Sequence, residues 1–87
     1  MQRKGIHPKI RAELSELIEF LETLGYTCIS SEYSPGAFGN FYLDLVGRKG
    51  SIRLIRDKSQ YSIDGTNLDV TEDRDEFTAA VILWLQI

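Results

Sequence analysis

The chain has very little of the chemistry that small active sites commonly use. Its 87 residues include one cysteine, Cys28, and one histidine, His7. A single cysteine cannot form an intramolecular disulfide, and one cysteine with one histidine cannot complete a tetrahedral zinc site. A nucleophile paired with a base would require Cys28 or a hydroxyl to meet His7, which lies beside Pro8 near the N-terminus. We therefore predict a protein that is not an enzyme and that has no metal and no cofactor.

Long hydrophobic runs are also absent. The longest, residues 79–85, has seven residues, far fewer than the roughly 20 that span a bilayer. The first eight residues contain basic side chains and a proline but no apolar segment of the kind found in a signal peptide. We therefore expect a soluble, cytoplasmic protein that makes no use of membranes.

Charge of one sign is not in large excess. Ten lysines and arginines against thirteen aspartates and glutamates give a net charge of -3, which disfavours a partner held mainly by its phosphates. Acidic residues are concentrated in residues 64–76, but a calcium loop starting at Asn67 would need glycine where Glu72 stands. The sequence leaves open whether this acidic segment binds a cation.

Two segments have the periodicity of helices. Between residues 8 and 24, apolar side chains recur on one face, and Pro8 and Gly25 suit the start and the end of such a helix. A second helix is predicted to begin near Thr71 or Asp73 and to reach about residue 85. It is apolar almost all round, so we expect it to be buried on more than one side.

Between these helices the periodicity falls to about two, which is typical of strands. Residues 67–70 form a further short edge strand or a loop. The order predicts an α+β fold: an N-terminal helix, a three- to four-stranded antiparallel meander and a C-terminal helix, with both helices on one sheet face. We expect a single domain over residues 1–87, with residues 1–7 flexible. The strand segments are residues 26–33, 41–46 and 51–56, followed by a further hairpin arm in which Tyr61 and Ile63 alternate and which ends at residues 64–65.

Alternation along the strands assigns their side chains to two faces. Two short helices cover only one face of a small sheet, so the other is expected to be open. Its mixture of aromatic, aliphatic and charged residues is typical of a protein-binding surface; an ordinary sheet surface, with pairs such as Asp44 and Arg53 serving only stability, fits equally well. The face toward the helices is predicted to hold Phe41, Leu43, Leu45, Ile52, Leu54, Tyr61 and Ile63, and the open face Tyr42, Asp44, Val46, Arg53, Ile55, Gln60, Ser62 and Asp64.

Our first hypothesis is a binding site for a protein partner on the open face and on the loop of residues 34–40. The apolar anchors are predicted to be Phe38, Tyr42 and Ile55. Orientation and association rate are predicted to be set by Asp44, Arg53 and Arg56.

Two other hypotheses follow from other segments. Ile82, Leu83 and Ile87 are predicted to form the seam of a homodimer, because little else in a chain of this size can cover the C-terminal helix. The basic hairpin of residues 48–58 predicts salt-dependent binding of single-stranded nucleic acid by charge and stacking, although the net charge makes a nucleic-acid partner the less favoured one.

The sequences EYSPGAFGN at residues 32–40 and IRLIRDKSQ at residues 52–60 resemble small uncharacterised bacterial proteins. Over residues 10–85, the helix, meander and helix layout is similar to that of immunity proteins carried beside polymorphic and contact-dependent toxins. The resemblance implies a non-enzymatic inhibitor that binds one cognate toxin. It assigns no contact residues, because the class shares no binding motif. The basic hairpin departs from the acidic surface of nuclease inhibitors, which leaves the toxin class open.

Overall fold

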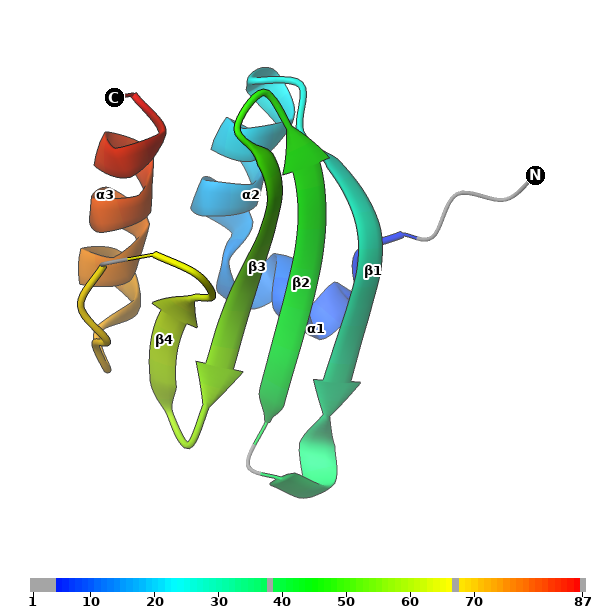
Figure 1. Ribbon diagram of the computed structural model, residues 1–87. Helices are drawn as coiled ribbons and strands as arrows, with labels where there is room; N and C mark the ends of the chain where they lie inside the picture. The colour runs from blue at the N-terminus through cyan, green and yellow to red at the C-terminus, as the bar shows by residue number, and fades with distance from the viewer. Residues whose placement is uncertain (1–4, 38, 67, 87) are drawn as a thin grey trace.

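A four-stranded antiparallel meander forms the centre of the structure, with helices before and after it (Figure 1). The computed structural model describes residues 5–37, 39–66 and 68–86. The strands pair in the order β1-β2-β3-β4, which confirms the predicted α+β meander between helices. The elements are α1 (Pro8–Glu13), α2 (Ser15–Thr23), β1 (Thr27–Ser34), a 3-10 turn (Pro35–Ala37), β2 (Asn40–Gly47), β3 (Gly50–Asp57), β4 (Gln60–Ile63) and α3 (Arg74–Leu85).

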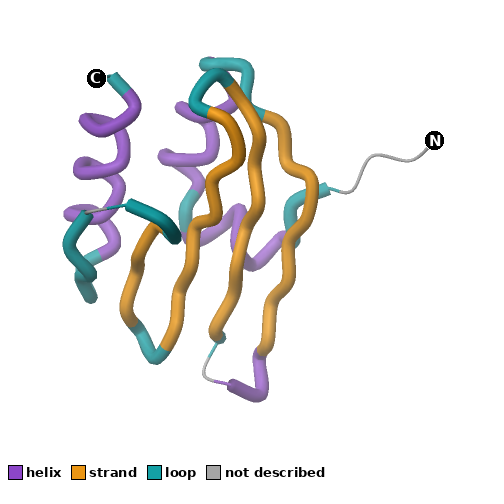
Figure 2. Tube along the Cα trace, viewed as in Figure 1, coloured by secondary structure: helices purple, strands orange, loops and turns teal. Residues whose placement is uncertain are grey.

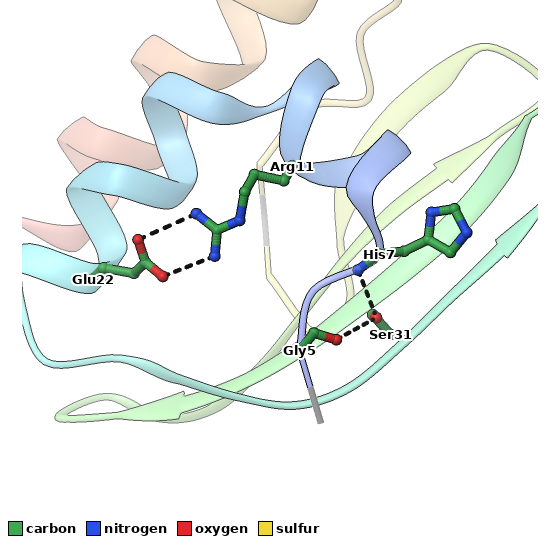
Figure 3. Close-up of polar contacts among 5 residues, drawn as sticks. All are labelled: Gly5, His7, Arg11, Glu22 and Ser31. Carbon is green, nitrogen blue, oxygen red and sulfur yellow. Dashed lines mark hydrogen bonds and ion pairs between the residues drawn. The ribbon is translucent and has the colours of Figure 1, made fainter. Parts of the chain in front are cut away.

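The first predicted helix is interrupted at Leu14, so the prediction of one continuous helix is wrong. Leu14 has φ -113° and ψ 32°, ending α1 and starting α2. An ion pair shows that the helix bends here, because Arg11 Nη2 lies 3.0 Å from Glu22 Oε2 (Figure 3). In a straight helix, eleven residues would separate their backbones by about 16 Å. Ile10, Leu14 and Leu17 are all buried in the core on either side of the break.

His7 attaches the start of α1 to the first strand (Figure 3). Its Nδ1 accepts a hydrogen bond from the Lys9 amide at 3.1 Å, as a helix cap, and its own amide donates to Ser31 Oγ at 3.2 Å. The imidazole stacks on Tyr33 with ring centroids 4.9 Å apart. Ser31 Oγ also donates to the Gly5 carbonyl at 3.4 Å, so residues 5–7 are held against β1.

One apolar core lies between the helices and the sheet. All seven sheet residues predicted to face the helices are buried. In Figure 1, α1 and α2 lie behind the sheet and α3 lies beside β4. Burial of a leucine, isoleucine or phenylalanine contributes roughly 1.5–3 kcal/mol, so this layer supplies most of the stability. The helices contribute Ile10, Leu14, Leu17, Ile18, Leu21, Phe77, Val81 and Leu85.

Strand β1 lies at one edge of the sheet and carries a β-bulge. The pairing with β2 shifts between Cys28 and Ser30, so Ile29 is an extra residue and is 52% exposed. The Cys28 thiol is half-buried, contacts the core and donates to the Ser30 carbonyl at 3.6 Å. Burial raises the pKa of this thiol.

The segment after β4 is a loop in which the described residues 68–70 form no strand. The strand alternative for residues 67–70 is therefore wrong for this part, and residue 67 lies outside the described residues. A single bridge covers the edge of β4: the Tyr61 amide donates to the Thr71 carbonyl at 2.7 Å, and the Thr71 amide donates back at 3.2 Å.

Helix α3 is capped as predicted but is covered on one side only. Asp73 Oδ1 accepts from the Glu76 amide at 3.0 Å, and acidic residues occupy the first turn, where they suit the positive end of the helix dipole. The expectation of burial on more than one side is met only in part. Ile82 and Trp84 are half-buried, but Leu83 is 64% exposed.

The turn between β2 and β3 holds the C-terminal end of α3. Arg48 Nη2 donates to the Leu85 carbonyl at 2.6 Å, and Lys49 Nζ lies 5.2 Å from the centre of the Trp84 ring. The last carbonyls of a helix lack intrahelical partners and carry partial negative charge. Arg48 therefore satisfies the helix end and fixes α3 to the sheet.

Replacing this contact should measurably destabilise the protein. We expect Arg48→Met, which keeps the apolar stem, to lower the free energy of unfolding by about 1–2 kcal/mol, because the helix end loses a charged donor. Urea unfolding followed by circular dichroism measures the loss. Arg74→Met is the control, because Arg74 pairs with the exposed Asp75, at 3.4 Å, and should cost clearly less. Equal losses would contradict the role of Arg48.

Candidate protein-binding face

The sheet face turned away from the core is not covered by any described part of the chain. In Figure 2 the four strands lie in front, with the helices of residues 8–23 behind them. The strand register defines this open face and aligns its side chains in four rows. A central row holds Glu32, Tyr42, Ile55 and Ser62; one flanking row holds Ser30, Asp44 and Arg53, and the other Ser34, Asn40, Asp57 and Gln60. A fourth row, beyond Asp44, holds Thr27, Val46 and Ser51, and Val46 is 39% exposed, as expected for the open face.

An apolar pair occupies the centre of the open face. Tyr42 and Ile55 are directly opposite each other on β2 and β3. Polar and charged side chains surround them, and Asp64 extends one flanking row because its amide donates to the Arg53 carbonyl at 3.0 Å. An apolar centre inside a polar rim is the usual arrangement of a protein interface.

Arg53 and Asp44 form the cross-strand pair that the sequence predicted. Arg53 Nε and Nη2 donate to the two carboxylate oxygens of Asp44 at 2.6 and 2.9 Å. The guanidinium also lies over the Tyr42 ring, 4.4 Å from its centre. The hydrogen bonds to Asp44 raise the pKa of Arg53. This geometry holds the guanidinium and the ring in fixed positions.

A groove of about 240 Å³ crosses the apolar pair. Tyr42 and Ile55 line this groove, and the Tyr42 hydroxyl donates a hydrogen bond to Glu32 Oε2 at 3.3 Å. At the end near the turn between β3 and β4, Asn40 Nδ2 donates to Asp57 Oδ1 at 3.1 Å. The groove is therefore shaped by contacts that the protein makes with itself.

Arg56 is among the residues that line the groove, but its guanidinium makes its contacts on the helix side, and Phe38 lies outside the described residues. Arg56 follows the alternation of Leu54, so its side chain leaves the sheet on the helix side. Its Nε lies 3.1 Å from Glu13 Oε2, and its Nη1 donates to the Gly39 carbonyl at 3.0 Å. Tyr42, Asp44, Arg53 and Ile55 are the predicted binding residues that share the open face.

Arg56 belongs to a polar cluster that the sequence reasoning missed. The Tyr61 hydroxyl donates to Glu13 Oε2, and the Tyr61 ring stacks on Phe77 with centroids 5.4 Å apart. The helix periodicity placed Glu13 on the solvent side. One signal was available: a tyrosine predicted to face the core requires a partner for its hydroxyl. Burial, reinforced by the hydrogen bond to Glu13, raises the pKa of Tyr61.

This shift predicts a loss of stability in alkali. The pKa of Tyr61 is higher in the folded chain than in the unfolded chain, where it is about 10. The contribution of Tyr61 to the free energy of unfolding is therefore complete below about pH 10 and declines as the pH rises above that value. Urea unfolding between neutral and alkaline pH should show this decline for the wild type. The Tyr61→Phe variant should lack that part of the decline, whereas Tyr42→Phe should keep it. Parallel profiles for wild type and Tyr61→Phe would contradict the assignment.

The cations of the basic hairpin do not form one surface. Arg48 and Lys49 contact α3 at one end of the sheet. Arg53 pairs on the open face, Arg56 pairs beneath the sheet, and Lys58 lies in the turn at the other end. Binding of nucleic acid therefore stays a prediction, without a continuous basic surface among the described residues to favour it.

The residues predicted to form a dimer seam lie only partly at the surface. Ile82 is half-buried, Leu83 is 64% exposed, and Ile87 lies outside the described residues. Ile82 and Leu83 line a groove of about 540 Å³, together with Thr78 and Ala79 of α3 and Glu16 of α2. The homodimer stays a prediction, with this groove as its place in the fold.

No group of three or more His, Cys, Asp or Glu side chains is positioned to hold a metal ion in residues 5–37, 39–66 and 68–86. Of the acidic segment, Asp73 is engaged as the cap of α3. Among the described helices, none combines the length and the apolar character needed to cross a bilayer.

No family model, curated protein or solved structure matches this chain. The resemblance to immunity proteins therefore stays a prediction, and any proposal of function depends on the geometry of the molecule itself.

Proposed function

We propose that the protein binds another protein through its open face and acts without chemistry of its own, as an immunity-type inhibitor binds its toxin. The observation that carries the proposal is the apolar pair of Tyr42 and Ile55, set in a groove within a charged rim on an uncovered sheet face. A cross-strand pair of an aromatic and a β-branched residue also stabilises a sheet, but the groove and the charged rim around this pair favour a surface used for recognition.

Contacts within the face orient its central side chains before any partner arrives. Tyr42 lies between the Glu32 carboxylate, which accepts from its hydroxyl, and the Arg53 guanidinium stacked on its ring. Ordering flexible side chains costs about 0.5–1.5 kcal/mol each on association. Side chains that are already fixed on adjacent strands avoid much of this cost, which favours a surface used for recognition.

Substitutions on the face should weaken partner binding without unfolding the protein. We expect Tyr42→Ala and Arg53→Glu each to lower affinity at least about tenfold, the first by removing an anchor and the second by placing a carboxylate beside Asp44. Capture from the organism that encodes the protein, followed by mass spectrometry and calorimetry with the isolated partner, measures the effect.

Arg74→Glu is the matched control for Arg53→Glu. Both arginines are about half exposed, and both pair with a neighbouring aspartate, but Arg74 begins α3, away from the open face. Affinity should survive Arg74→Glu, and thermal unfolding should confirm that all variants fold. If neither Tyr42→Ala nor Arg53→Glu changes the affinity for the partner, the open face is not its binding site.

A second candidate function is self-association through α3. It is favoured by Leu83, the most exposed large hydrophobic side chain in the described residues, beside the groove of about 540 Å³. Sedimentation velocity at micromolar concentration should then show a dimer that Leu83→Glu dissociates, since a carboxylate is costly to bury. A wild-type protein that stays monomeric would remove this candidate.

A further inference from the structure

The charges around the groove indicate which kind of partner it fits. Four carboxylates, those of Glu32, Asp44, Asp57 and Asp64, stand on the open face against the single guanidinium of Arg53. Two further cations are near: Arg56 lines the groove but pairs with Glu13 on the helix side of the sheet, and Lys58 lies in the turn beyond β3. The sequence led us to expect mixed charges here, but in the fold the face is acidic.

Arg53 offers little attraction to an incoming anion. Asp44 already holds its guanidinium through two hydrogen bonds at 2.6 and 2.9 Å, and Asp64 lies close enough to act on its charge. An anionic group approaching the groove would therefore meet a neutralised arginine and the repulsion of the remaining carboxylates.

Glu32 and Asp57 are bound by neutral donors instead. Glu32 accepts from the Tyr42 hydroxyl at 3.3 Å, and Asp57 accepts from the Asn40 amide at 3.1 Å. Hydrogen bonds of this kind orient a carboxylate but do not cancel its charge. Both residues line the groove, and its two arginines, Arg53 and Arg56, are paired with Asp44 and Glu13. The carboxylates of Glu32 and Asp57 therefore stay available to a visiting cation.

We propose that the groove receives an arginine side chain from a basic surface of the protein partner, an inference that rests on the proposed function. The apolar stem of an arginine can lie along Tyr42 and Ile55 while its planar head pairs with the Glu32 carboxylate. Lysine matches the charge but not the two-point geometry of a carboxylate. The partner is therefore a protein that places an arginine among apolar residues.

The proposal is tested with short peptides and ¹⁵N-labelled protein. Acetyl-Leu-Arg-Leu-amide is titrated in parallel with its Leu-Gln-Leu and Leu-Glu-Leu counterparts. The arginine peptide should shift the backbone amides of Glu32, Tyr42 and Ile55 and bind more tightly than the other two. Glu32→Gln should weaken it about three- to fivefold, and added salt should weaken it as well. The control is Glu19→Gln, on the exposed side of α2, which should change nothing.

The outcomes separate this inference from the proposed function. Equal shifts from the glutamine peptide, or stronger binding of the glutamate peptide, would overturn the arginine preference and leave the open face as a protein-binding surface. An arginine peptide that moves no amide of the face would also overturn the inference. The proposed function would still be decided by partner capture with Tyr42→Ala and Arg53→Glu.

Discussion

Contact between the helices and one side of the sheet is the interaction on which the rest of the structure depends. The apolar stripe of α1 and α2, together with Phe77, Val81 and Leu85 of α3, is enough to cover one face of four short strands and no more. In a chain this small, the surface that can be buried is limited. The same limit that fixes the core also leaves the second face for another molecule.

Polar contacts at the edges of the core give the arginines of the central hairpin different roles. Arg48 closes the end of α3, Arg56 meets Glu13 beside the core, and Arg53 lies on the open face with Asp44. Arg53 and Arg56 are three residues apart and therefore leave the strand on opposite sides. Strand alternation thus assigns structural and recognition roles to side chains of the same type.

Local patterns predicted the order of the elements, the buried sheet residues, the start of α3 near Asp73 and the Asp44 and Arg53 pair, because each depends on near neighbours or on alternation. The break at Leu14 was not predictable, since the apolar spacing around it fits a continuous helix equally well. The contact of Glu13 with Tyr61 joins residues far apart in the chain and follows from how α1 is docked. The last turn of α1, just before the break at Leu14, places Glu13 against Tyr61 of β4. The periodicity of the sequence does not indicate this contact.

The bulge in β1 affects how molecules of this protein meet at high concentration. A regular strand at the edge of a sheet offers a continuous ladder on which another chain can extend the sheet, the first step toward fibres. The extra residue Ile29 breaks that ladder near its beginning and leaves a shorter regular stretch beyond it. The sheet can therefore display a flat side for docking while giving a second copy little edge on which to polymerise.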